Sequence, residues 1–245
     1  MSSVLLNCLL FILSVRAYLP NLLTLCNLLF GCIGLVYVSN DALTTAAYLI
    51  WLAAAFDFAD GLLARAFKAY SDIGKQLDSL ADMVSFGVLP AYIMYALIDT
   101  QTDHPFLPFI AFLIAAFSAL RLAIFNVDTR QTHAFIGVPT PANALFISSF
   151  PLIITYYDHL NYVLFLNNAW VLTGLTLLLS YLLIARIELL AFKFKQTTWQ
   201  GNEARYLFMI VTILLFILLK VAAIPVIFVL YLGISVVNNN FTRKA

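Results

Sequence analysis

The chain has 245 residues, a net charge of +1 and a mean hydropathy of +0.97, and only 10% of its residues are charged. Soluble globular domains carry about a quarter of their residues as charged side chains, so this composition excludes that class. It predicts an all-α polytopic membrane protein that has the lipid bilayer as its surroundings and no nucleic-acid partner.

Eight apolar segments are candidate membrane spans, because about 20 apolar residues cross a bilayer as a helix. In chain order they cover residues 21–38, 43–67, 76–98, 106–127, 138–156, 160–184, 205–219 and 221–237. A further apolar stretch at residues 4–15 is too short to span. We interpret it as an interfacial or partly inserted helix.

Basic residues collect on one side of this predicted arrangement. With the amino terminus inside and an even number of spans, every lysine and arginine except Lys220 falls on or near the inner side. Cytoplasmic loops accumulate these residues. The asymmetry predicts a multi-pass protein of an inner or plasma membrane, with residues 65–75 at the cytoplasmic face.

Four aspartates and two glycines interrupt the second and third apolar segments. They are Asp57, Asp60, Gly61, Gly74, Asp78 and Asp82. Spacings of three and four residues place those of each segment on one helical face. Consecutive helices joined by a short loop pack antiparallel, so the two acidic faces can meet. A lone charge at membrane depth costs roughly 2.5 to 3.5 kcal/mol, and the aspartates therefore need a cation partner.

The donor set indicates which cation this is. Oxygen ligands without histidine or cysteine suit Mg²⁺, Mn²⁺ or Ca²⁺. Four carboxylates exceed what one Mg²⁺ usually takes from protein, which favours two ions and chemistry on a diphosphate. Arg65, one turn after Gly61, is placed to meet a phosphate. The alternative is that the acids form salt bridges with Arg65, Lys68 and Lys75, but this does not explain the neighbouring glycines.

The pattern that carries these residues resembles the signature of the CDP-alcohol phosphotransferase family. These membrane enzymes move a phosphatidyl or similar group from a CDP-linked donor to an alcohol. The pattern is Asp-x-x-Asp-Gly-x-x-Ala-Arg from Asp57 to Arg65 and, after eight residues, Gly-x-x-x-Asp-x-x-x-Asp from Gly74 to Asp82. The resemblance implies that the four aspartates bind two divalent ions and that Asp82 is also the base.

Neighbouring stretches resemble bacterial and archaeal phosphatidylserine synthases. These stretches are residues 20–31, 77–91, 121–126 and 135–142. The likeness implies that CDP-diacylglycerol is the donor, L-serine the acceptor, and phosphatidylserine and CMP the products. The donor-binding residues that it implies are Asn21, Thr24, Gly61, Ala64, Arg65, Ser71 and Gly74.

The resemblance also divides the chain. It implies an N-terminal interfacial segment at residues 1–19, a six-helix core at 20–185, and a basic linker with about two added transmembrane helices at 186–245. Members of this family are commonly homodimers, so we expect one here. The family usually has a basic residue where Ile124 stands, and this chain departs from the pattern there.

The acceptor side is less sharply marked. A serine carboxylate needs a cation, and Arg121 is the candidate, because an arginine in an apolar span is expected to face the bundle interior. It can also snorkel to the interface. Asn126 and Arg130 are further candidates, whereas the three histidines are expected as solvated loop residues.

Two alternatives to serine transfer stay open. A sibling enzyme would use glycerol 3-phosphate or an inositol phosphate, and it would need more basic residues facing the site than the later segments supply. A cation transporter would also use carboxylates within the membrane, but it would not need the Asp-Gly pattern at the cytoplasmic end.

Overall fold

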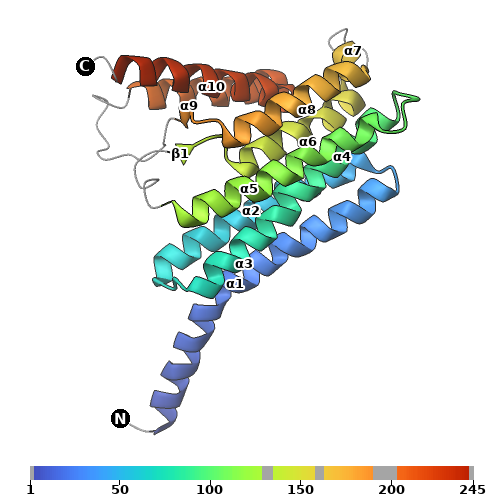
Figure 1. Ribbon diagram of the computed structural model, residues 1–245. Coiled ribbons are helices and arrows are strands. Elements are labelled where there is room, and N and C mark those ends of the chain that lie inside the picture. Colours follow the sequence, from blue (N-terminus) through green and yellow to red (C-terminus); the bar gives the residue numbers. More distant parts are fainter. Residues whose placement is uncertain (1–2, 129–134, 158–162, 190–202, 243–245) are drawn as a thin grey trace.

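The computed structural model describes residues 3–128, 135–157, 163–189 and 203–242, and in these ranges it is almost entirely helical (Figure 1). Among the described residues, five helical stretches are long and apolar enough to cross a membrane. They are Tyr18–Ser39, Leu43–Phe67, Asp72–Asp99, Leu107–Val127 and Tyr206–Ser235. The predicted all-α membrane fold is confirmed.

Within the described residues, each of the eight predicted apolar segments overlaps helix. The first three lie within α1 (Ser3–Ser39), α2 (Leu43–Phe67) and the continuous stretch of α3 (Asp72–Asp82), η1 (Met83–Val88) and α4 (Leu89–Asp99). The next three contain η2 (Leu107–Phe112) with α5 (Leu113–Val127), α6 (Thr140–Tyr156), and α7 (Val163–Leu166) with α8 (Ala169–Ile184). The last two overlap α9 (Glu203–Leu219) and α10 (Ala223–Thr242), which are joined by η3 (Lys220–Ala222).

Helix α1 is longer than the first predicted span. It continues without a break through Pro20, so the helix does not end at the expected segment boundary at residue 19. The first part of α1 extends beyond the rest of the bundle (Figure 1).

Local capping explains the sharp turn between α2 and α3. Helix α2 ends at Phe67, and Lys68 adopts a left-handed conformation with φ of 53° while its N–H bonds back to the last turn. Ser71 then caps α3, because its Oγ accepts a hydrogen bond from the Gly74 N–H at 2.9 Å. Both helices pack on α1 but make few close contacts with each other. This leaves space between them.

The apolar core lies around α4 and α6. Ile93, Met94 and Ile147 are among its fully buried residues. Beside it, β1 (Phe135–Ile136) and β2 (Glu188–Leu189) form one short antiparallel pair that ties the start of α6 to the end of α8. Helices α9 and α10 pack on the outside, with α10 against α6 (Figure 1).

Candidate active site

A cavity of about 510 Å³ opens among α1, α2 and α3 and the turn between the last two. Its lining contains all four predicted metal-binding aspartates and all seven predicted donor-binding residues. Pro20, Phe58, Ala69, Tyr70 and Lys75 complete the wall. Three separate stretches of sequence thus contribute to one concave site.

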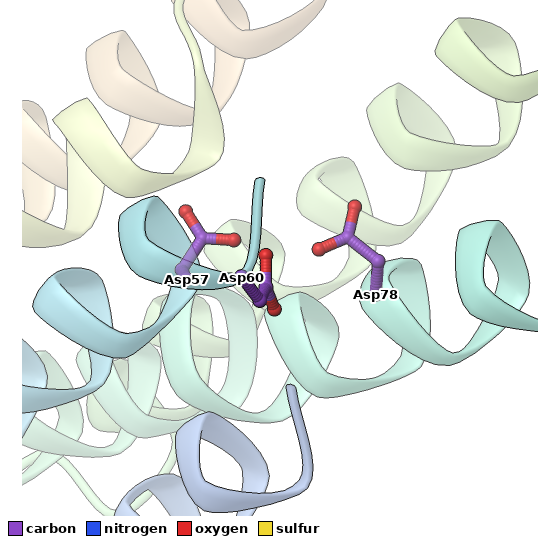
Figure 2. Close-up of side chains that lie close together, drawn as sticks. All are labelled: Asp57, Asp60 and Asp78. Atoms are coloured by element: carbon purple, nitrogen blue, oxygen red, sulfur yellow. The ribbon is translucent and has the colours of Figure 1, made fainter. Parts of the chain in front are cut away.

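Three of the aspartates converge within the cavity. One carboxylate oxygen from each of Asp57, Asp60 and Asp78 lies within 4.8 Å of the other two. Figure 2 shows Asp57 and Asp78 pointing toward each other from opposite helices, with Asp60 between them. The expectation that the acidic faces of the two helices meet is confirmed, although they meet across a cavity rather than in direct helix packing.

Basic side chains do not neutralise this cluster. No lysine or arginine in the described ranges forms a salt bridge with the three carboxylates, and the charged neighbours of Asp57 are Asp60, Asp78 and Asp82. Lys75 instead donates a hydrogen bond to the backbone oxygen of Asn126 at 2.9 Å. The arrangement therefore fits a hard divalent cation better than the salt-bridge alternative.

Side chains of helix α1 donate hydrogen bonds to two of the aspartates. Thr24 Oγ1 donates to Asp60 Oδ2 at 2.5 Å, and Asn27 Nδ2 donates to Asp82 Oδ1 at 3.2 Å. Sequence reasoning did not single out Asn27. The available signal was the spacing of Asn21, Thr24 and Asn27, three polar residues at intervals of three in an apolar helix.

Two glycines shape the cavity wall in different ways. A Cβ built on Gly61 would meet only Arg65 Nη2, at 3.9 Å, so a larger side chain here would enter open space in the cavity. A Cβ on Gly74 would lie 3.0 Å from both Asn21 Oδ1 and Ser71 Oγ. Gly61 thus leaves room for a ligand, while Gly74 allows two polar side chains to approach the backbone.

The predicted acceptor residues lie outside the lining of this cavity. Arg121 is 7% exposed and faces the bundle interior, as expected. Asn126 donates to Ser79 Oγ at 2.8 Å, so its amide already has a protein partner. Ile124 is 45% exposed and points out of the bundle. Arg130, His133 and His159 lie outside the described residues, and His104 is exposed beside Trp170.

Sequence comparison identifies a family model and several curated relatives that match this chain. A family model described as CDP-alcohol phosphatidyltransferase matches residues 17–181. A CDP-diacylglycerol–serine O-phosphatidyltransferase of Helicobacter pylori strain J99 is 28% identical over 221 residues, which cover 89% of this chain and 90% of that protein. The Bacillus subtilis protein of the same name is 32% identical over 180 residues, which cover 72% of this chain and 92% of that protein. An archaetidylserine synthase of Methanothermobacter thermautotrophicus is 36% identical over 137 residues, 55% of this chain and 58% of that protein.

Proposed function

Because this chain belongs to the CDP-alcohol phosphatidyltransferase family, we propose that it transfers the phosphatidyl group of CDP-diacylglycerol to the hydroxyl of L-serine. The products are phosphatidylserine and CMP. The names of its relatives support this choice of donor and acceptor. The observation that carries the proposal is that all the predicted metal-binding and donor-binding residues line one cavity.

We assign the aspartates to two divalent ions, Mg²⁺ or Mn²⁺, with Ca²⁺ as the alternative. The convergence of the Asp57, Asp60 and Asp78 oxygens without a basic partner supports this assignment. Such ions, when bound, neutralise charge on a diphosphate and align it for displacement. Arg65 and the open wall at Gly61 lie in the same lining, where they receive the CDP portion of the donor.

Asp82 acts as the base. The serine hydroxyl is a weak nucleophile at neutral pH, so it needs a proton acceptor within hydrogen-bond reach. Asp82 takes this proton while the serine oxygen bonds to the phosphorus that carries the diacylglycerol group, and the bond from that phosphorus to CMP breaks. The described cavity lining contains Ser71 but no histidine to activate it and no cysteine, which supports direct transfer without a covalent enzyme intermediate.

Arg121 binds the carboxylate of the acceptor. Its burial supports this role, because a desolvated guanidinium favours an anionic partner. We place the cavity at the cytoplasmic face, since Arg65 and Lys75 line it and Lys68 ends α2 beside it. The homodimer remains a prediction from the family resemblance.

A single assay separates the competing functions. The purified protein is reconstituted into liposomes with CDP-diacylglycerol, and CMP release is measured with L-serine, glycerol 3-phosphate or inositol phosphate, with and without Mg²⁺ or Mn²⁺. We expect metal-dependent CMP release with serine alone. CMP release with a phosphorylated acceptor instead would identify a sibling enzyme. Cation flux across the same liposomes, measured without any CMP release, would identify a transporter.

A further inference from the structure

Unpartnered polar side chains are buried in α5 and α6, outside the cavity wall described above. Thr140 and Asn143 are both 0% exposed, and the Thr140 hydroxyl and both amide atoms of Asn143 have no hydrogen-bond partner within the described ranges. The hydroxyl of Ser118 and Nε of Arg121 are also unpartnered there. Native proteins rarely leave buried polar atoms unpaired, so this group indicates a missing ligand.

The register between α5 and the α3–η1 stretch places Arg121 beside Asp82. Asn126 of α5 donates a hydrogen bond to Ser79 of α3. Further along, the Ser118 Cβ of α5 packs against Gly87 of η1, at 3.2 Å from the position that a Cβ on this glycine would take. The two helices run antiparallel, and interpolation between these contacts puts Arg121 level with residue 84, within one turn of Asp82. The Arg121 guanidinium also interacts electrostatically with the Asp82 carboxylate.

Contacts on the other faces of α6 show where its unpartnered residues point. Ser148 accepts a hydrogen bond from a tryptophan of α2 at 2.9 Å, and Phe146 packs on a phenylalanine of α10 with 4.4 Å between ring centroids. At about 100° per residue, Thr140 and Asn143 lie on the stripe that faces neither α2 nor α10. The remaining neighbours of α6 are η1, α4, α5, α8, α7 and η3, and of these the largest contacts are those with η1 and α4. The stripe therefore faces the interior next to the segment that follows Asp82.

We propose that Asn143 and Thr140 bind the ammonium group of an amino-acid acceptor whose carboxylate is held by Arg121. This inference rests on the proposed function, because it assigns the acceptor subsite of that reaction. The Asn143 carbonyl and the Thr140 hydroxyl accept hydrogen bonds from an ammonium, and a guanidinium pairs with a carboxylate through two parallel N–H donors. The acceptor hydroxyl is then left to approach Asp82.

The charge of the pocket also favours a zwitterion over a phosphorylated alcohol. Arg121 is the only buried lysine or arginine in the described part of the chain. One cation matches one carboxylate, whereas a phosphate carries more negative charge and usually takes several basic partners. The Asn143 amide and the Thr140 hydroxyl can donate hydrogen bonds to a phosphate, but they add no positive charge to balance it.

The test uses the full-length protein and two variants, Asn143→Leu and Thr140→Val. For Asn143→Leu we expect the KM for L-serine to rise about 10- to 100-fold, the loss typical of hydrogen bonds to a charged group, with the KM for CDP-diacylglycerol unchanged. The inhibition constant of 3-hydroxypropanoate, which keeps the carboxylate and hydroxyl but lacks the ammonium, should stay the same. Thr140→Val should shift the serine KM in the same direction by less.

Ser149→Ala is the matched control, because Ser149 is also 0% exposed on α6 but its hydroxyl already donates to the Phe146 carbonyl at 2.6 Å. It should keep wild-type kinetics. Asn143→Leu removes unpartnered polar atoms, so its thermal midpoint without serine should not fall. An unchanged serine KM in both variants overturns the inference, as does an equal loss for serine and 3-hydroxypropanoate. If wild-type protein releases no CMP with serine, it is the proposed function that fails.

Discussion

The amide of Asn27 on α1 donates a hydrogen bond to the carboxylate of Asp82 at the end of α3, with 3.2 Å between the two atoms. The backbone carbonyl oxygen of Asn27 also accepts a hydrogen bond from Ser85 Oγ at 2.9 Å. One residue of α1 is thus tied to both sides of the junction at which α3 passes into the π-helical segment η1. Short π-helical segments occur frequently at functional sites, and this one begins directly after the proposed base.

Replacing Asn27 should slow turnover more than it weakens binding. In Asn27→Leu the Asp82 carboxylate loses a buried hydrogen bond that orients it, and we expect kcat to fall about 10- to 100-fold. The KM values for both substrates should change little. Steady-state CMP release measures both parameters. Cys32→Ala, at an exposed position on the same helix, should behave like wild type, and an unchanged kcat in Asn27→Leu would refute the orienting role.

Divalent ions should stabilise the folded protein through the aspartate cluster. A ligand that binds only the folded state at 100 times its Kd adds about 2.7 kcal/mol to the free energy of unfolding, so Mg²⁺ or Mn²⁺ should raise the thermal midpoint of the metal-free protein. Asp78→Asn should lose this response together with activity.

Asp41→Asn provides the matched control for the metal experiment. Asp41 is exposed in the turn between α1 and α2 with φ of 59°, a conformation that asparagine also adopts readily. The variant should keep the full thermal response to the metal. A response that survives in Asp78→Asn would show that the ions bind elsewhere.

Gly61→Leu should block the donor site without unfolding the helix. The new side chain would enter the cavity, since a Cβ at this position has no near neighbour except Arg65 Nη2. We expect the KM for CDP-diacylglycerol to rise at least tenfold. The control is Gly174→Leu on α8, where an added Cβ meets nothing within 4 Å. Both substitutions should stabilise their helices, by up to about 1 kcal/mol, because glycine is a poor helix former. Equal kinetics in the two variants would contradict the proposed donor site.

Gly31→Ala should destabilise the contact between α1 and η1. A Cβ on Gly31 would clash with Ser85, including its backbone Cα at 3.0 Å, and the η1 backbone cannot move aside as a flexible side chain would. Overpacking of this kind costs about 1 to 3 kcal/mol. Thermal unfolding in detergent should show a lower midpoint than wild type, whereas Gly233→Ala, with nothing within 4 Å, should not lower it. A Gly31→Ala midpoint at or above that of wild type would show that the contact can relax.

Much of the fold and half of the site could be predicted from local patterns. Apolar length located every described helix, and the spacing of Asp57, Asp60 and Gly61 placed them on one face before any packing was known. The same local patterns ranked Arg121 ahead of Asn126 as an acceptor residue, but they did not show which of the two side chains already has a protein partner. In the structure the first is buried and unpartnered at Nε, while the second is hydrogen bonded to Ser79.

The sequence by itself determined the acidic faces, the glycine gaps between them and the membrane class, because helical periodicity and apolar length depend only on residues a few positions apart. The tertiary structure alone decided that Asn27 supports Asp82, 55 residues away, and that Asn143 is buried without a partner. An apolar helix offers several similar faces to its neighbours. Which face is buried against which helix depends on the packing of the whole bundle, and no local spacing records it.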